Sequence, residues 1–194
     1  MADPRDLPLF AQALRRDRRR RMLRRRGLAV ALGVAALGLI IVAPPRPRLL
    51  WNASASVPIG LYRVGAAPAP APGELVVAWL PGPARRLAAQ RRYLPGNVPA
   101  IKRVAAVAGA RICGIGATLT IDGRAVAHRL AADRLGRPLP RWEGCRTLRI
   151  GELLLLNPAS PASFDGRYFG ASRTSDVVGT AHPLWTWHAA ETGA

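Results

Sequence analysis

The strongest constraint on this chain is a charged run that gives way abruptly to an uncharged one. Residues 1–26 hold ten Arg and three Asp, a net charge of +7, and residues 27–43 (GLAVALGVAALGLIIVA) hold no charge. As a helix rising about 1.5 Å per residue, this uncharged segment spans roughly 26 Å, slightly less than the roughly 30 Å hydrocarbon core of a bilayer. Pro44 and Pro45 follow at once and end a helix. We therefore expect a basic cytoplasmic arm over 1–26 and a transmembrane anchor over 27–43.

The arm also predicts the orientation of the anchor. Positive charge is retained on the cytoplasmic side of a membrane, and few charges follow directly after the apolar segment. Beyond a juxtamembrane stalk at 44–51, the remaining residues are then expected outside the cytoplasm. A cleaved secretory signal is the alternative, because signal peptides also begin with a basic and then an apolar region. The nearest Ala-x-Ala cleavage pattern, Ala53-Ser54-Ala55, lies far downstream, so an uncleaved anchor is favoured.

The formal net charge of +18 raises the question of a nucleic acid partner. The arm alone supplies +7 of this charge, and it lies next to an apolar segment. At that place, a topology signal in contact with lipid headgroups is the better explanation. We therefore expect a single-pass membrane protein with no nucleic acid partner.

Beyond the stalk, the sequence carries strand signals. Apolar runs bounded by Gly, Pro or Asp predict strands at Glu74–Leu80, at Leu119–Val126 with a hairpin turn at Asp122-Gly123, at Leu148–Leu156 and at Thr180–Trp187. One or two helical turns are expected around Ala84–Arg92. The predicted fold is a single, mostly β domain over 52–188 with a short tail at 189–194.

Two cysteines, Cys113 and Cys145, fall in this domain. Neither belongs to a Cys-x-x-Cys pair or has a His neighbour, so we expect no metal site. Outside the cytoplasm they can form a disulfide that closes a loop of about thirty residues, worth roughly 3–4 kcal/mol in the chain-entropy model. Two buried thiols are the alternative, and the disulfide is favoured.

A hydrolytic serine needs a base, and histidine is not a promising one here. The three histidines are His128, His182 and His188, and no Gly-x-Ser-x-Gly nucleophile motif occurs. Lys102 is the only lysine among 29 basic Lys and Arg residues, and Arg cannot be deprotonated. A neutral lysine near pH 7 requires its pKa to fall by about 3 units from about 10.4, which burial among apolar neighbours can supply.

Ser56 is the candidate nucleophile because Pro58 and Gly60 predict a rigid, exposed turn just after it. Ser54, two residues earlier in an extended segment, is expected to face the same side. Its hydroxyl and the backbone N–H of Ser56 then suit an oxyanion. Ordinary loop serines are the alternative for both.

A lysine-poor composition also follows from a GC-rich genome, so the rarity of lysine supports the assignment of Lys102 but does not establish it.

Together these residues resemble the signal peptidase superfamily that uses a Ser/Lys dyad (S26-like), most closely its conjugal-transfer branch, the TraF-type peptidases. The resemblance lies in three ordered segments: Asn52-x-Ser54-x-Ser56-Val-Pro58-x-Gly60-Leu-Tyr62, Ile101-Lys102-Arg103-Val104 to Gly109, and Ser163-Phe-Asp165-Gly-Arg167-Tyr-Phe-Gly170. Two features differ from the general secretory branch. Val57 replaces its Met after the nucleophile, and Gly109-Ala110 replaces its Gly-Asp.

The resemblance implies a signal-peptidase-like β fold and a role for each site residue. Ser56 would be the nucleophile and Lys102 the general base, with Ser54 supporting the oxyanion. Asp165 would belong to the catalytic group and Arg167 would support it, with a structural ion pair as the alternative for both. An apolar surface patch near the site would face the bilayer.

The expected function is therefore that of a serine endopeptidase in a bacterial inner membrane, with a periplasmic catalytic domain. Its substrate would be a pilin precursor or another exported protein of conjugation or type IV secretion. Water or an amine could resolve the acyl-enzyme, giving a linear or a cyclic product. A general signal peptidase and a catalytically silent component of a secretion apparatus are the alternatives. We expect no cofactor.

Overall fold

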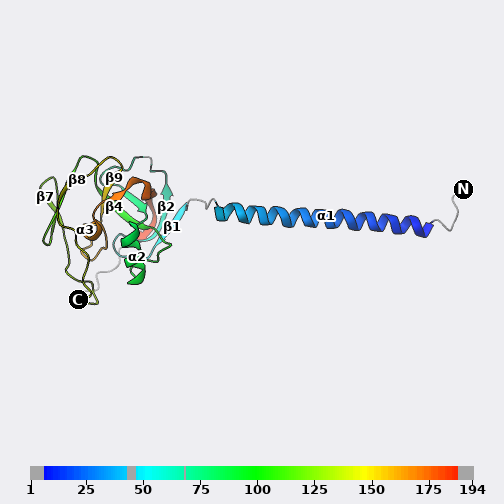
Figure 1. Ribbon diagram of the computed structural model, residues 1–194, viewed down its shortest axis with the longest axis horizontal. Coiled ribbons are helices and arrows are strands. Elements are labelled where there is room, and N and C mark those ends of the chain that lie inside the picture. Colours follow the sequence, from blue (N-terminus) through cyan, green and yellow to red (C-terminus); the bar gives the residue numbers. More distant parts are fainter. Residues whose placement is uncertain (1–6, 43–46, 68, 188–194) are drawn as a thin grey trace. The chain divides into compact units, whose positions relative to one another are not determined.

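The computed structural model describes residues 7–42, 47–67 and 69–187, which fall into two compact units, 1–46 and 47–194 (Figure 1). The first unit is a single helix, α1 (Leu7–Val42), which covers most of the predicted arm and anchor. Among the described residues, no helix combines the length and the apolar character that a bilayer crossing requires. Ala43, Pro44, Pro45 and the predicted tail at 189–194 lie outside the described residues.

The second unit is built from two antiparallel sheets and is mostly β, as predicted. The larger sheet has the order β1-β2-β11-β3-β4-β9-β10. Its strands are β1 (Leu49–Asn52), β2 (Ile59–Gly65), β3 (Leu75–Ala78), β4 (Ala100–Val107), β9 (Glu152–Leu156), β10 (Ser172–Arg173) and β11 (Val177–Trp187). The smaller sheet, in the order β7-β6-β5-β8, contains β5 (Arg111–Ile115), β6 (Thr118–Ile121), β7 (Arg124–His128) and β8 (Gly144–Thr147). Two short helices complete the unit, α2 (Gly82–Gln90) and α3 (Gly166–Phe169), with a 3₁₀ turn at Thr174–Asp176.

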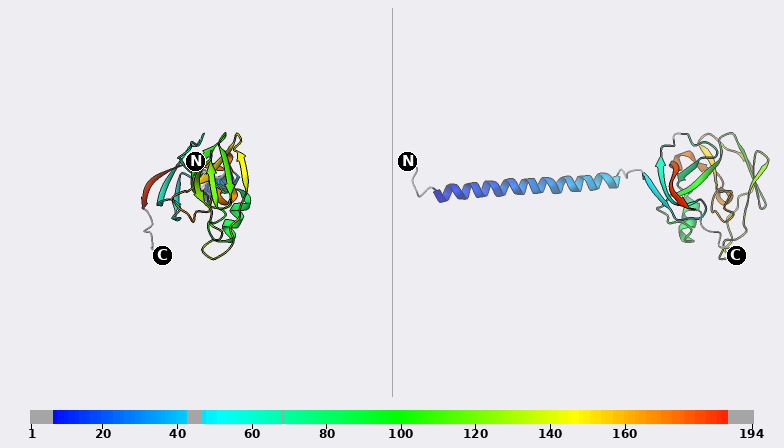
Figure 2. Two further views of the ribbon diagram at one scale, coloured as in Figure 1. Left: turned by 90° about the vertical axis from the view of Figure 1, so that its left-hand side faces the viewer. Right: turned by 180° about the vertical axis from the view of Figure 1, so that it is seen from behind.

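Most of the predicted strands are present, with corrected bounds. The Asp122-Gly123 hairpin is confirmed, since both residues take the positive φ (50° and 80°) that a tight hairpin turn requires. The run Leu148–Leu156 was predicted as one strand, which is wrong in its first half. A turn with Gly151 at φ 83° interrupts it, and β9 begins only at Glu152. β11 is longer than predicted and lies between β2 and β3 in the sheet order. Its end is the red strand in Figure 2.

The core lies on both faces of β9, which explains its unbroken apolar sequence. Leu154 and Leu156 pack into a cluster with residues of the smaller sheet, such as Ile112. Leu153 and Leu155 pack on the opposite face. A strand buried on both faces gains from apolar residues at every position, whereas a half-buried strand alternates. β9 is thus buried on both faces and pairs with β4, the strand that carries Lys102.

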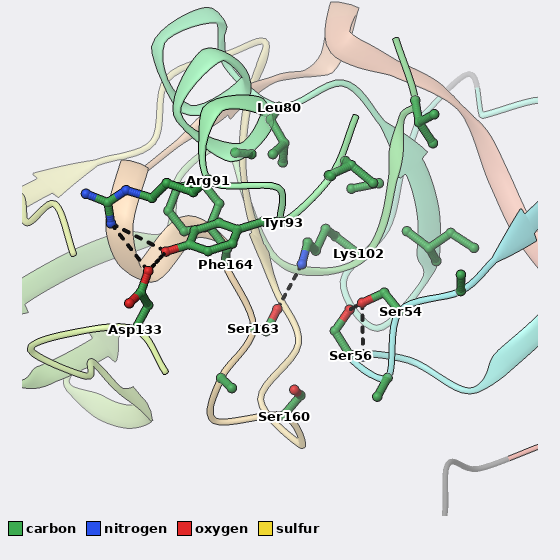
Figure 3. Close-up of a pocket in the computed structure, with 18 of the residues that line it drawn as sticks. Ser54, Ser56, Leu80, Arg91, Tyr93, Lys102, Asp133, Ser160, Ser163 and Phe164 are labelled. Carbon is green, nitrogen blue, oxygen red and sulfur yellow. Dashed lines mark hydrogen bonds and ion pairs between the residues drawn. The ribbon is translucent and has the colours of Figure 1, made fainter. Parts of the chain in front are cut away.

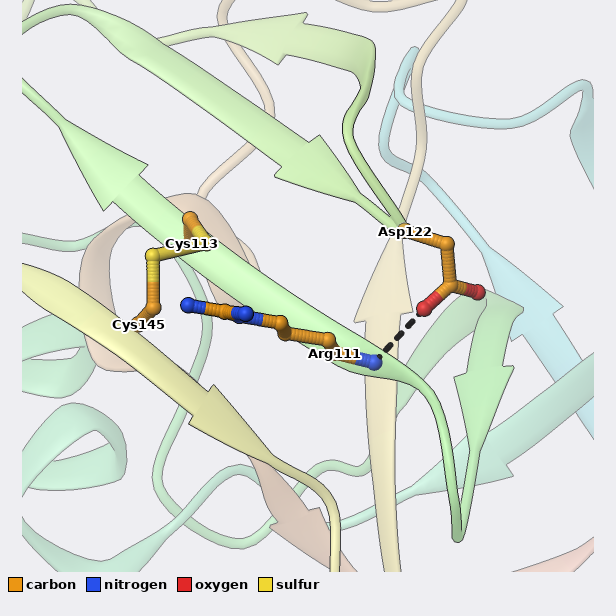
Figure 4. Close-up of a disulfide and its surroundings, with 4 residues drawn as sticks. All are labelled: Arg111, Cys113, Asp122 and Cys145. Atoms are coloured by element: carbon orange, nitrogen blue, oxygen red, sulfur yellow. Dashed lines mark hydrogen bonds between the residues drawn. A yellow bond between two sulfur atoms is a disulfide. The ribbon is translucent and has the colours of Figure 1, made fainter.

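The smaller sheet carries a disulfide between Cys113 on β5 and Cys145 on β8 (Figure 4). The two residues are directly opposite each other in the antiparallel register, 32 residues apart in sequence. The disulfide therefore closes the segment that contains β6, β7 and the long connection from β7 to β8.

Candidate active site

Lys102 lies on β4 with its side chain turned inward. Its residue is 5% exposed, while Arg103, on the opposite face of the strand, is exposed as predicted. The Lys102 Nζ donates a hydrogen bond to Ser163 Oγ at 2.8 Å (Figure 3). The amine is thus held by a neutral acceptor inside the protein, 61 residues away in sequence.

Burial lowers the pKa of Lys102 from its ordinary value of 10.5 to about 8. The nearby carboxylate of Asp165 favours the ammonium and raises the pKa, whereas the guanidinium of Arg167 opposes it and lowers the pKa. A substantial fraction of the amine is therefore neutral in mildly alkaline water, and such an amine can accept a proton.

Ser56 lies in the loop between β1 and β2. The segment was predicted to be extended, which is wrong. After Asn52 the chain turns, and the Asn52 side chain holds this turn by hydrogen bonds to the backbone of the loop. Its Nδ2 donates to the carbonyls of Ser54 (2.8 Å), Val57 (3.2 Å) and Pro58 (3.0 Å), and its Oδ1 accepts from Ser54 N–H (3.1 Å).

The return from this loop into β2 is fixed from the other side. The Tyr62 hydroxyl donates to the Pro58 carbonyl at 2.6 Å. Gly60 has φ +141°, and a Cβ there would lie 2.1 Å from the carbonyl oxygen of Trp185. No other residue fits that position, so the glycine predicted to permit a turn is required by the close approach of β11.

Ser54 and Ser56 meet despite the turn. Their Oγ atoms are 3.0 Å apart, and the Ser56 N–H donates to Ser54 Oγ at 3.3 Å. The two groups predicted to hold an oxyanion, the Ser54 hydroxyl and the Ser56 N–H, are therefore neighbours. To bind an oxyanion, both donors must turn from one another toward the substrate.

A cavity of about 740 Å³ brings these residues together. Ser54 and Ser56 line it together with Lys102 and Ser163, and Figure 3 shows Lys102 between the Ser54/Ser56 pair and the aromatic residues Tyr93 and Phe164. Apolar side chains form most of the remaining wall, including Leu80, Leu94, Val98, Leu130 and Leu139. The serine and the lysine thus face one space that is large enough to enclose a ligand.

Asp165 and Arg167 form a buried ion pair beside this space. The Asp165 carboxylate accepts from Arg167 Nε and Nη2, both at 2.9 Å, and from the Asn157 N–H at 2.9 Å. Arg167 Nη2 also donates to the carbonyls of Asn157 (2.8 Å) and Ser160 (2.7 Å). The pair therefore fixes the connection between β9 and α3, which carries Ser163.

Three residues with clear roles in this geometry received none from the sequence. Ser163, Asn52 and Tyr62 all lie in the motifs quoted above, but their partners are set by the tertiary structure. A serine 61 residues from a lysine gives no local signal. The only signal in the sequence for these three residues is that the three motifs occur together in one chain.

The described residues contain no group of three or more His, Cys, Asp or Glu side chains that could hold a metal ion. His182 Nε2 lies 2.9 Å from Thr180 Oγ1, on the larger sheet, and His188 lies outside the described residues.

An exposed aromatic cluster lies next to the serine loop. Trp51, Trp185 and Trp187 are 50%, 65% and 42% exposed, and their ring centroids are 5.4–6.4 Å apart. Trp51 directly precedes Asn52 and also lines the cavity. Large exposed aromatic groups of this kind mark surfaces that meet a partner or a membrane interface.

Several known proteins are similar to this chain. The family model "Signal peptidase, peptidase S26" matches residues 21–187. A plasmid transfer protein TraF of Escherichia coli is 33% identical over 168 residues, which cover 81% of this chain and 94% of the relative. A probable conjugal transfer protein TraF of Sinorhizobium fredii is 32% identical over 178 residues, which cover 84% and 93%. Among solved structures, a signal peptidase I of Enterococcus faecalis V583 is 18% identical with a TM-score of 0.35, over 58% of this chain and 96% of that one.

Proposed function

Because the chain belongs to the signal peptidase family, peptidase S26, we propose that it is a serine endopeptidase with a Ser56/Lys102 dyad. One observation carries this proposal: a lysine that is 5% exposed, with a pKa lowered to about 8, faces the same cavity as a serine held in a rigid turn. Burial of an amine costs free energy, and ionisable groups with strongly shifted pKa values are typical of catalytic sites, which favours Lys102 as a general base.

In the proposed mechanism, neutral Lys102 takes the proton from Ser56 Oγ as this oxygen attacks a peptide carbonyl carbon. The developing oxyanion accepts hydrogen bonds from the Ser56 N–H and the Ser54 hydroxyl. The Lys102 ammonium then passes its proton to the leaving amine, and an ester with Ser56 remains. Water, deprotonated by Lys102, hydrolyses the ester, or an amine of the substrate attacks it and closes a ring.

The proposed substrate is a pilin precursor or another exported protein of conjugative transfer or type IV secretion. Two relatives that are 33% and 32% identical are named as plasmid or conjugal transfer proteins, which supports this choice over a general signal peptidase. The intact Ser56, Lys102 and Asp165 disfavour a silent structural component. Asp165 and Arg167 would act by positioning, since their contacts are with each other and with the loop that carries Ser163.

We also propose a membrane location, with the catalytic unit on the periplasmic side of a bacterial inner membrane. Six apolar side chains of α1 are 62–68% exposed and are therefore available to contact lipid: Leu28, Val30, Leu32, Val34, Leu37 and Leu39. The Arg-rich run before them supports a cytoplasmic N-terminus. The exposed tryptophan cluster near Ser56 suits work at a membrane interface.

The experiment that tests the function is mass spectrometry of a candidate pilin precursor co-expressed with wild-type protein, with Ser56→Ala and with Lys102→Arg. Processing by wild type alone supports the dyad, because a guanidinium keeps the charge but stays protonated. A product one water lighter than the linear fragment identifies cyclisation. Processing that persists in Lys102→Arg contradicts the general-base assignment, and unchanged precursor in all three favours the structural alternative.

A further inference from the structure

The end of the cavity beyond Lys102 is closed by a polar cross-link that the mechanism above does not use. Its centre is Asp133, whose Oδ2 accepts from the Tyr93 hydroxyl and from Arg137 Nε (2.7 Å). Its Oδ1 accepts from the backbone N–H groups of Leu135 and Arg137, both at 2.9 Å. These bonds lower the pKa of Asp133, against the opposing effect of burial, so it is a carboxylate at neutral pH. We call Tyr93, Asp133 and Arg137 the latch.

The latch joins two segments that the sequence separates by about forty residues. Tyr93 follows α2, whereas Asp133 and Arg137 belong to the connection between β7 and β8. Arg91 strengthens the joint, since its Nη1 donates to the Pro138 carbonyl at 3.0 Å. Within the connection, Ala132 and Pro138 form a bridge, and backbone hydrogen bonds run from the Asp133 N–H to the Arg137 carbonyl and from the Leu139 N–H to the Ala131 carbonyl. The side-chain bonds of the latch add to these and attach the connection to the segment after α2.

The latch also touches the catalytic side of the cavity. The Tyr93 ring packs on Phe164, with centroids 5.4 Å apart, and Phe164 stacks on Tyr168 at 5.7 Å with nearly parallel planes. Phe164 follows Ser163, the residue that holds Lys102 Nζ. In Figure 3, the Arg91–Tyr93–Asp133 group lies on the far side of Lys102 from Ser56. The latch and the dyad are therefore the two ends of one cavity.

We infer, on the basis of the proposed peptidase function, that Tyr93, Asp133 and Arg137 determine substrate specificity by holding the far wall of the cavity in place. The two segments that the latch joins contribute apolar side chains to the cavity lining: Leu130 and Leu139 from the connection, and Leu94 and Val98 from the segment after α2. An extended substrate with its scissile carbonyl at Ser56 would lay apolar side chains against this wall. The latch residues themselves are polar, bonded to each other, and act by position.

The test is digestion of a mixture of randomised synthetic peptides by the full-length protein in detergent, with cleaved sites read by mass spectrometry. Wild type, Tyr93→Phe and Asp133→Asn are compared, Asp122→Asn is the matched control, and Ser56→Ala shows which cleavage depends on Ser56. Asp122 accepts the Arg111 N–H on the smaller sheet and does not line the cavity. Tyr93→Phe removes only the hydroxyl and keeps the ring against Phe164.

Wild type and Asp122→Asn are expected to prefer an apolar side chain at a fixed distance from the scissile bond. In Tyr93→Phe and Asp133→Asn, we expect the ratio of kcat/KM between peptides with and without this apolar side chain to fall about tenfold. This is the range in which an apolar subsite discriminates between substrates. The loss should appear in KM for the apolar peptides, while kcat and its dependence on pH near 8 stay as in wild type, because Lys102 and Ser163 are untouched.

Three results would overturn the inference. The preference could be retained by both variants, which shows that the wall does not need the latch. All peptides could lose activity equally with a lower melting temperature, which shows a merely structural role. If wild type shows no cleavage that Ser56→Ala abolishes, the proposed function itself fails and the inference falls with it. The first two results overturn the inference alone and leave the proposed function standing.

Discussion

A lysine serves as a base near neutral pH only where nothing nearby holds its proton strongly. Lys102 meets this condition, since its partner Ser163 Oγ is neutral and the nearest carboxylate, Asp165, is neutralised by Arg167. Without Arg167, the charge of Asp165 would act unopposed and raise the pKa of the lysine. The buried ion pair therefore lies beside the proposed dyad, and its two charges have opposite effects on the pKa of Lys102.

A pH dependence of activity follows from the pKa of Lys102. The proposed reaction needs the neutral amine, so kcat/KM should rise about tenfold per pH unit below pH 8 and level off above it. Because folding lowers this pKa from 10.5, the unfolded chain binds more protons between about pH 8 and 10.5, and stability rises with pH across that window. A steady-state pH profile with a fixed peptide checks the first point. A flat profile between pH 6 and 9 would contradict the assignment of Lys102 as base.

At the scale of the elements, the loop between β1 and β2 depends on one amide side chain. Asn52→Asp keeps the shape but replaces an NH₂ donor by an oxygen that faces the carbonyls of Ser54, Val57 and Pro58. We expect a loss of about 1–3 kcal/mol in the free energy of unfolding, and a fall in kcat of up to about a hundredfold as Ser56 moves.

Thermal unfolding and peptide cleavage of the same preparation measure both effects of this change. Asn97→Asp, on an exposed turn, is the matched control and should leave both unchanged. Full activity in Asn52→Asp would show that the turn is held by Tyr62 and Gly60 alone.

The elements that could be predicted from the sequence are those whose ends are marked by local turn residues. The Asp122-Gly123 hairpin and β3 were predicted because turn residues bound them. Lys102 could be found because it lies among apolar residues and is the only lysine in a chain with 28 arginines. The run Leu148–Leu156 was misread because uniform apolarity does not reveal a turn at Gly151. The roles of Ser163 and of the latch depend on contacts between distant segments, which no local pattern encodes.

At the scale of the whole molecule, the chain joins a basic and apolar helix to a unit with an exposed tryptophan cluster, of which Trp51 lines the cavity. Cys113 and Cys145 stabilise that unit at the edge of the smaller sheet, where they are joined across β5 and β8. Such a disulfide persists in an oxidising compartment, which accords with the proposed periplasmic side.

The proposed anchor can be tested by adding charge to it. The double change Leu32→Arg with Leu37→Arg places two guanidinium groups in the uncharged segment, each costing about 2.5–3.5 kcal/mol at the centre of a membrane helix. We expect wild type to stay with membranes washed in alkaline carbonate and the double variant to be released. Ile150→Arg, at a position 98% exposed on a turn of the second unit, adds a charge elsewhere and should stay bound. Release of the wild type by carbonate would instead mean surface attachment through the arginine run and the tryptophan cluster, with the same dyad working from outside the bilayer.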